Sequence, residues 1–285
     1  MNVIDMNNIQ HCKCHETFKL LEKEKDKNDY LSLKLDIHES KKNIGEKDEL
    51  LSILELYNWN KIGNYAKLVH IFGSDASDGI SIIDPNTNSL LVITNMKKSK
   101  SGSKSDIQIQ MNKTQTISNV SIKSNNGSKP SILNHTPRTA NVFNNTGILH
   151  KYLPSLDILI EEYINKRIDN IISEDAPLCV FECMKEKNIY QDVIDVLLYF
   201  IFDGTGKGLS KNQANSILLI DKNISFVECY TLAQKKLYVE SLLKKCVISL
   251  RQKGMPPQNK YTENPWCFQD KITGHVKGCL HIRMK

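Results

Sequence analysis

Two short segments near the middle of the chain alternate between apolar and polar residues, as a β-strand with one buried face does. In the first, residues 106–110, two isoleucines alternate with an aspartate and two glutamines. In the second, residues 120–124, a serine and a lysine flank an isoleucine. Because side chains two apart share a face of a strand, Ser121 and Lys123 should lie on one side, opposite Ile122.

Fourteen residues separate Asp106 from Ser121, which is enough for the chain to turn and return as a neighbouring strand. The two segments are therefore predicted to form a hairpin. One face of that hairpin would gather a carboxylate, a hydroxyl and an ammonium group.

The hydrophobic pattern elsewhere predicts an α/β protein. A helix is expected over residues 46–58, where Leu50, Ile53, Leu54 and Tyr57 recur at helical spacing. The first 40 residues are expected to form helix and loop. Further helices are predicted over 155–173, 190–202 and 232–245, and further strands over 68–72, 89–94, 216–219, 224–227, 247–250, 266–268 and 279–283.

Together these elements predict a central mixed β-sheet flanked by helices, with additional helices and strands toward the C-terminus. The best boundary between domains lies at residues 144–151. Residues 1–145 would then hold an N-terminal helical arm and a catalytic core, and residues 146–285 would serve recognition or complete that core. A single domain is the alternative.

The amino-acid composition indicates the general class of protein but excludes few functions. Of the 285 residues, 40% are hydrophobic and 25% charged, as in soluble globular proteins. A net charge of +6 is compatible with a polyanionic partner without being diagnostic of one. No run of about 18 apolar residues and no signal peptide is visible, so no membrane partner and a cytoplasmic location are expected.

Eight cysteines in such a chain are expected to be reduced thiols. The cluster His11-Cys12-Lys13-Cys14-His15 resembles a set of zinc ligands. Its Cys-x-Cys spacing is tighter than the usual zinc pattern, and no second pair nearby completes four ligands. The role of this cluster stays open.

The hairpin residues suit a divalent metal beside a phosphodiester. Mg²⁺ takes oxygen ligands, typically one or two carboxylates with water and substrate phosphate. Asp106 would be the carboxylate, and the carbonyl of Ile122 could supply another oxygen. Lys123 would orient or deprotonate the attacking water. The alternative is a solvated sheet face, where such residues are common.

The order of Asp106, a spacer and then Ser121-Ile122-Lys123 resembles the PD-(D/E)XK nucleases, especially the type II restriction endonucleases. Their pattern is an aspartate, a spacer and then acid-x-lysine, so Ser121 stands where the family usually has Asp or Glu. The resemblance covers roughly residues 40–145. It implies a restriction-endonuclease-like fold, a Mg²⁺ cofactor and hydrolysis of double-stranded DNA, with Asp106, Ser121 and Lys123 in the catalytic site.

The family often begins the preceding helix with a glycine and a glutamate that approaches the metal. Here Gly45 and Glu49 have that spacing, so the resemblance makes Glu49 a catalytic residue and metal ligand, with Glu46 as the substitute. The alternative is that acids in a first helical turn only complement the helix dipole.

The polar stretch 124–139 is expected to be a long loop that leaves the hairpin and contacts DNA. Asparagine and arginine make bidentate contacts with bases, and lysine suits phosphates. The candidate DNA-binding residues in this loop are Asn125, Asn126, Lys129, Asn134 and Arg138. A solvated surface loop is the alternative.

Three functions follow as hypotheses. The first is a type II restriction endonuclease, an endodeoxyribonuclease of a restriction-modification system that makes sequence-specific, Mg²⁺-dependent cuts. The others are a repair or junction-resolving nuclease of the same superfamily and a non-catalytic DNA-binding or interaction protein. A cognate DNA methyltransferase would be a system partner, not a bound subunit. Monomer and homodimer both stay open, as do the recognition sequence and the cut position.

Overall fold

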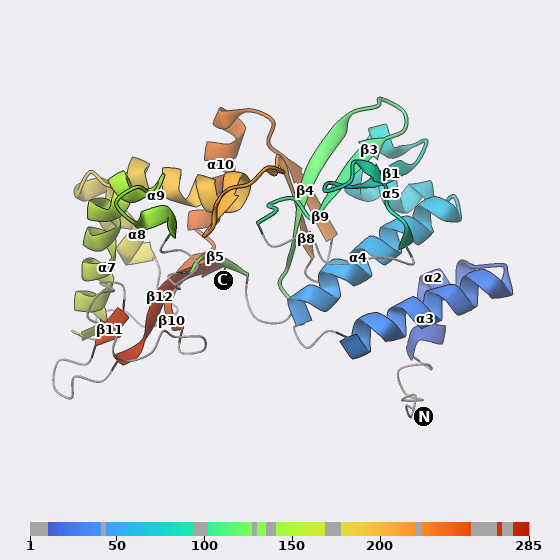
Figure 1. Cartoon of the computed structure of the whole chain (residues 1–285), viewed down its shortest axis with the longest axis horizontal. Coiled ribbons are helices and arrows are strands. Elements are labelled where there is room, and N and C mark those ends of the chain that lie inside the picture. Colours follow the sequence, from blue (N-terminus) through green and yellow to red (C-terminus); the bar gives the residue numbers. More distant parts are fainter. Residues whose placement is uncertain are drawn as a thin grey trace. The chain divides into compact units, whose positions relative to one another are not determined.

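A mixed α/β architecture is observed in the computed structural model, with a multi-stranded mixed sheet flanked by helices (Figure 1). Its chain divides into two compact units, each discontinuous in sequence. Unit 1 comprises residues 1–100, 105–128 and 216–228, and unit 2 comprises 101–104, 129–215 and 229–285. The residues that the structure describes are 11–40, 44–93, 102–126, 130–134, 141–168, 178–220, 224–251, 267–269 and 276–284.

The sheet of unit 1 has six strands in the order β2-β1-β3-β4-β8-β9. Neighbouring strands are antiparallel except β4 and β8, which are parallel. The bounds are β1 Ile80–Asp84, β2 Ser89–Leu90, β3 Ile107–Met111, β4 Ile117–Ser124, β8 Ser216–Ile220 and β9 Ile224–Glu228. β4 therefore lies inside the sheet, and the hairpin predicted from the sequence is confirmed as β3 and β4.

Helices α4 (Ile44–Lys61) and α5 (Tyr65–Phe72) cover one face of this sheet. Ile53 and Leu56 of α4 and Leu68 and Phe72 of α5 share one apolar core with the inward residues of the strands. Each of these side chains is at most 8% exposed, so this core is the main apolar contact of unit 1.

Helix α4 is buried on two sides, because α2 (Glu16–Leu20) and α3 (Glu24–Ser40) lie on the side away from the sheet. Leu50 and Leu54 of α4 pack there with Tyr30 and Ile37 of α3. Unit 1 thus has three layers: the sheet, α4 with α5, and α2 with α3 (Figure 1).

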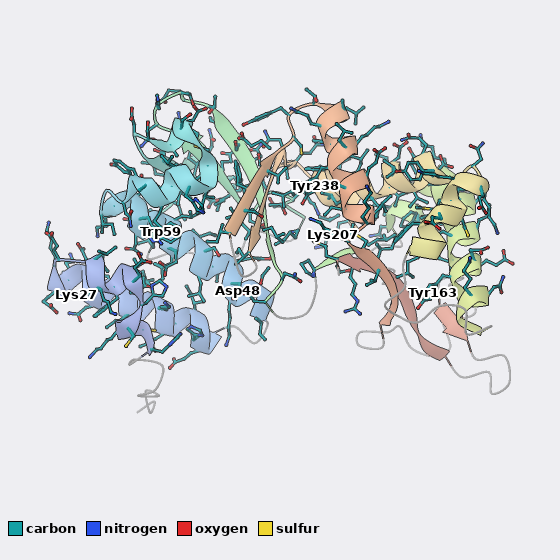
Figure 2. The ribbon with its side chains drawn as sticks, turned by 180° about the vertical axis from the view of Figure 1, so that it is seen from behind. Lys27, Asp48, Trp59, Tyr163, Lys207 and Tyr238 are labelled. Carbon is teal, nitrogen blue, oxygen red and sulfur yellow. The ribbon has the colours of Figure 1, made fainter. Side chains whose placement is uncertain are left out.

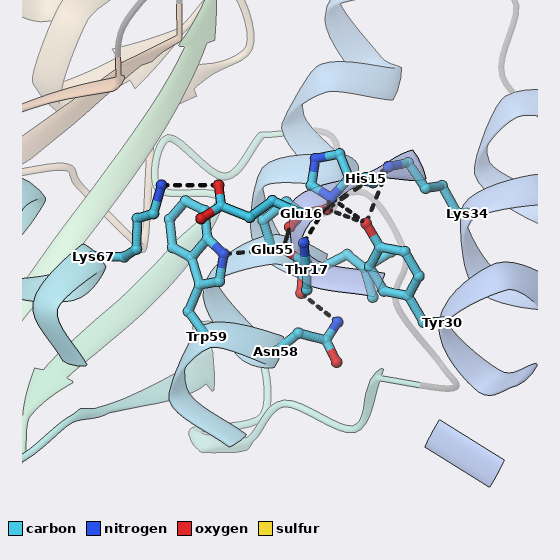
Figure 3. A network of polar contacts seen from close by, with 10 residues as sticks. His15, Glu16, Thr17, Tyr30, Lys34, Glu55, Asn58, Trp59 and Lys67 are labelled. Atoms are coloured by element: carbon cyan, nitrogen blue, oxygen red, sulfur yellow. Dashed lines mark hydrogen bonds and ion pairs between the residues drawn. The ribbon is translucent and has the colours of Figure 1, made fainter. Parts of the chain in front are cut away.

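A buried polar network joins the outer helical layer to α4 (Figure 3). Glu55 accepts hydrogen bonds from the hydroxyls of Tyr30 and Thr17, and Tyr30 also accepts one from Lys34 at 3.0 Å. His15 caps α2 by accepting from the Thr17 N–H at 3.3 Å and lies 3.0 Å from the Tyr30 hydroxyl. Since the acid and its partners are mutually satisfied, the network fixes how the layers meet.

Unit 2 combines a helical group with a second sheet. Helix α7 (Leu153–Ile168) packs on α8 (Leu178–Glu186) and α9 (Tyr190–Leu198). Helix α9 continues as a π-helix at Tyr199–Asp203. Helix α10 (Leu232–Leu243) also packs on α9. The sheet has four strands, in which β12 (Val276–Met284) pairs with β10 (Cys246–Arg251), β11 (Cys267–Gln269) and β5 (Ser131–Asn134). A small hairpin of β6 (Gly204–Thr205) and β7 (Gly208–Leu209) follows the π-helix.

Two predicted elements are wrong. Residues 68–72, expected as a strand, belong to helix α5, because Leu68 and Phe72 are four residues apart and bury on one helical face. The polar stretch 124–139 is not one loop: it contains strand β5, whose Leu133 is buried opposite Ile282. The pattern also gave no sign of β1, and the strand expected over 89–94 is only two residues long as β2.

None of the described helices is long and apolar enough to cross a lipid bilayer. The cysteine–histidine cluster at residues 11–15 is divided between environments, since Cys12 is buried and Cys14 exposed. Among the described residues, no three or more His, Cys, Asp or Glu side chains are grouped as a metal site.

Unit 1 should become less stable as the pH falls below about 6.5. Burial lowers the pKa of both His15 and His38 in the folded chain, so the unfolded chain binds more protons in this range. The free energy of unfolding should therefore decrease with pH. The midpoint of thermal unfolding, measured from about pH 7.5 down to about pH 5.5, should fall.

The substitution His15→Asn is the matched control, because asparagine can still cap α2 but does not titrate in this range. The fall in the midpoint should be smaller in this variant than in the wild type. Identical pH profiles would show that His15 does not contribute.

Candidate active site

The hairpin of β3 and β4 presents two different faces. Val120 and Ile122 of β4 and Ile107 and Ile109 of β3 point into the core beneath α4 and α5. The alternate residues therefore point to the opposite face of the sheet. These are Gln108 and Gln110 on β3 and Asn119, Ser121 and Lys123 on β4.

Asp106 stands immediately before β3 and binds β4 twice. Its main-chain N–H donates to the carbonyl of Val120 at 2.8 Å. Its carboxylate Oδ2 accepts from the main-chain N–H of Ile122 at 2.7 Å. The structure thus brings Asp106 to the strand that carries Ser121 and Lys123, as the sequence predicted, but with its carboxylate against the backbone of β4.

Main-chain groups of Ile122 contact both Asp106 and Lys123. The N–H of Ile122 holds Asp106, and its carbonyl oxygen accepts from the Lys123 Nζ at 3.1 Å. The Ile122 side chain itself is fully buried. The carboxylate and the ammonium group therefore both bind the main chain of one residue whose side chain the core fixes.

Two buried oxygen atoms in this segment have no hydrogen-bond partner among the described residues: Ser121 Oγ and Asn125 Oδ1. Leaving a buried hydroxyl unsatisfied costs about 1–3 kcal/mol, so such atoms in a folded protein call for an explanation. Both are oxygen donors of the kind that Mg²⁺ or its bound water takes. Ser121 lies next to Ile122, and Asn125 lies just beyond the end of β4, where its N–H donates to Ile220 at 2.7 Å.

Asp48 is a residue of this region that the sequence interpretation missed (Figure 2). It lies near the start of α4 and accepts a hydrogen bond from the buried Ser124 hydroxyl and one from Asn126 Nδ2 at 3.3 Å. Ser124 follows Lys123 directly, so Asp48 ties the end of β4 to α4. The available signal was spacing, because Asp48, Ser52 and Leu56 recur every four residues, and the last two are buried.

The other site residues predicted from the sequence lie on different elements from the hairpin or outside the described residues. Glu49 and Glu46 lie in the first turns of α4 and are half-buried. Asn126 binds Asp48, and Asn134 ends strand β5 in unit 2, paired with His281. Lys129 and Arg138 lie outside the described residues.

Three residues of this region carry oxygen atoms that could take part in holding a metal shared with a substrate. Asp106 contributes one carboxylate, Ile122 one carbonyl and Ser121 one hydroxyl. One or two carboxylates with water and substrate phosphate is the usual environment of Mg²⁺ in phosphate chemistry. A tight all-protein cage would need more acidic ligands than this set contains.

Comparison with known proteins identified no relative of this chain. No family model, no curated protein and no solved structure matches it.

Asp48→Ala should destabilise unit 1 by about 1–3 kcal/mol, because the buried Ser124 hydroxyl would lose its acceptor. Asp48→Asn keeps an oxygen that accepts from Ser124 and should lose much less. Denaturant unfolding of the two variants, followed by circular dichroism, measures the difference. Equal losses would mean that the charge at the start of α4 matters, and not the bond to β4.

Proposed function

We propose that this chain is a Mg²⁺-dependent endonuclease that makes sequence-specific hydrolytic cuts in double-stranded DNA, as type II restriction endonucleases do. One observation carries the proposal: Asp106 binds β4 at Ile122, between Ser121 and Lys123. The hairpin that the motif requires is therefore present, and the acid and the lysine both bind main-chain groups of the same residue, Ile122. The arrangement of helix α4, the antiparallel strands β1, β3 and β4, and the parallel strand β8 supports a restriction-endonuclease-like fold.

In this proposal Asp106, the carbonyl of Ile122 and the hydroxyl of Ser121 would hold the metal ion. A bound Mg²⁺ would lower the pKa of a water molecule and polarise the phosphoryl group. Lys123 would place its ammonium group against the charge that develops on the phosphate. The bond between Asp106 and the Ile122 N–H keeps the carboxylate in one orientation before substrate arrives.

Sequence specificity is proposed because the chain holds far more than a minimal cleavage site. Unit 2 adds a second sheet and a helical group, and the net charge of +6 suits a phosphate backbone. Asn125, Asn126, Lys129, Asn134 and Arg138 stay candidates for DNA contacts. The bond from Asn126 to Asp48 ties one of them to the start of α4.

A non-catalytic DNA-binding protein is the second candidate, and Ser121 is the observation that favours it. The serine removes the second acid of the motif and leaves Asp106 as the one carboxylate that the described contacts place at Ile122. A supercoiled plasmid incubated with Mg²⁺ separates the two functions, since only a nuclease converts it to nicked or linear DNA. Discrete fragments would further separate a restriction enzyme from a repair or junction nuclease.

Lys123→Ala should abolish cleavage, with a loss of at least about 100-fold, while DNA binding and the unfolding midpoint stay near those of the wild type. Among the described residues, the half-buried Lys123 side chain donates to the neighbouring carbonyl alone, so its removal should not disturb the core. Plasmid cleavage and binding to a labelled duplex in Ca²⁺ would measure both properties. A variant that cuts as fast as the wild type would exclude this lysine from the site.

Asp106→Ala should also abolish cleavage, and added Mg²⁺ should not restore the full rate, because a metal ligand is gone. Glu49→Gln should have an equal or weaker effect, since Glu49 lies on α4 and not at the hairpin. Rates measured across a Mg²⁺ titration would compare the two. An active Asp106→Ala protein with an inactive Glu49→Gln protein would place the metal at the helix.

A further inference from the structure

The two edges of the unit 1 sheet differ in how well they are protected against pairing with another strand. Folded proteins usually protect an edge with a very short strand, a lysine, a proline or a bulge. The edge strand β2 has only two residues and meets the first of these conditions. The other edge strand, β9, is five residues long, follows β8 without a bulge and contains neither lysine nor proline. β9 is therefore an open edge.

The outer side of β9 presents main-chain donors and acceptors. The N–H of Cys229, directly after β9, donates at 2.7 Å to the carbonyl of Asn215, directly before β8. Bonded pairs alternate along an antiparallel ladder, so the odd-numbered residues of β9 bond to β8 and the even-numbered ones point away from it. Among the described residues, the outward main-chain groups of Ile224 and Phe226 form no hydrogen bond.

The side chains of β9 leave this edge accessible. Ser225 and Val227 are exposed and lie on the face of the sheet away from the helices, whereas Phe226 packs against the core on the other face. Glu228 is the single charged residue of the strand. Its carboxylate accepts from the Ser118 hydroxyl of β4 at 2.7 Å, so it is directed across its own sheet and not over the edge.

We propose that the β9 edge is the contact between two copies of this chain. β9 of each copy would pair antiparallel with β9 of the other about a two-fold axis at Phe226, which joins two six-stranded sheets into one. Because Phe226 is the middle residue, this register overlaps the whole of both strands.

The sequence of β9 is complementary to itself in this register. Ser225 of one copy lies opposite Val227 of the second copy, and Glu228 lies opposite Ile224, so no like charges face each other. The two Phe226 residues exchange their outward N–H and C=O groups at the axis. A second copy therefore satisfies the main-chain groups and the charge of the edge together, and this inference does not depend on the proposed nuclease function.

Cysteine cross-linking of the full chain tests the register. Opposite residues of a non-hydrogen-bonded pair have Cα atoms about 4.5 Å apart, within the range of about 4.4–6.8 Å that disulfides span. Ser225→Cys mixed with Val227→Cys under mild oxidation should give a covalent dimer in higher yield than either variant alone. The wild type, which has eight cysteines of its own, sets the background. Leu90→Cys, on the β2 edge, should not cross-link with either variant.

A charge variant tests the contact without a cross-link. Sedimentation should show a wild type that changes from monomer to dimer as its concentration rises. Ser225→Lys/Val227→Lys places lysine opposite lysine twice and should weaken the dimer about tenfold or more. Both positions are exposed within one copy, so the circular dichroism spectrum should stay that of the wild type. Leu90→Lys/Val92→Lys adds the same charge at two other exposed positions and should leave the dimer unchanged.

Four results would overturn the inference. One is a wild type that stays monomeric at every concentration, and protection of its Phe226 amide from hydrogen exchange would then show that another part of the chain covers the edge. A second is a dimer that the lysine pair on β9 does not weaken, and a third is one that the control pair weakens equally. The fourth is Ser225→Cys that cross-links with itself as readily as with Val227→Cys, because this requires another register.

Discussion

The burial of Ile122 is the constraint on which the rest of the candidate site depends. Its side chain lies in the core under α4 and α5, and its main chain is paired on β4 with Leu218 of β8. The same residue holds Asp106 through its N–H and Lys123 through its carbonyl. Because the side chain cannot leave the core without exposing apolar surface, the two polar contacts are fixed by packing.

Helix α4 connects this core to the outer helical layer. On one side Ile53 and Leu56 press on the sheet, and on the other Leu50 and Leu54 pack against α3. Asp48 at one end of the helix binds Ser124, directly after Lys123, while Glu55 further along it belongs to the buried polar network. The outer helices therefore support the position of α4, and α4 supports the end of β4.

The chemistry of the hairpin follows from its position between two environments. One face is apolar and closed by helices, so it gives rigidity. The other carries amides, a buried hydroxyl and an ammonium group, so it is the polar face of the hairpin. In the proposed function, a metal ion and a substrate phosphate would complete the donor set that Asp106, Ser121 and the Ile122 carbonyl begin.

The sequence alone determined the local elements whose pattern is strong. Helix α4, strands β3 and β4 and the α/β class were predictable because apolar residues recur at 3.6 or 2 residues, and these elements are confirmed. The placement of Asp106 beside β4 also followed, since a short connection between alternating strands favours a hairpin. The helical state of the short apolar run 68–72 could not be predicted in the same way, because a segment of that length fits either a strand or one helical face.

Only the tertiary structure decided what lies next to the hairpin. β8 pairs with β4 although almost a hundred residues separate Ser121 from its partner Ile217, and no local pattern encodes such a pairing. Asp48 reaches Ser124 across 76 positions of sequence. Side-chain periodicity fixes the face of each residue, but only the packed layers fix its neighbours.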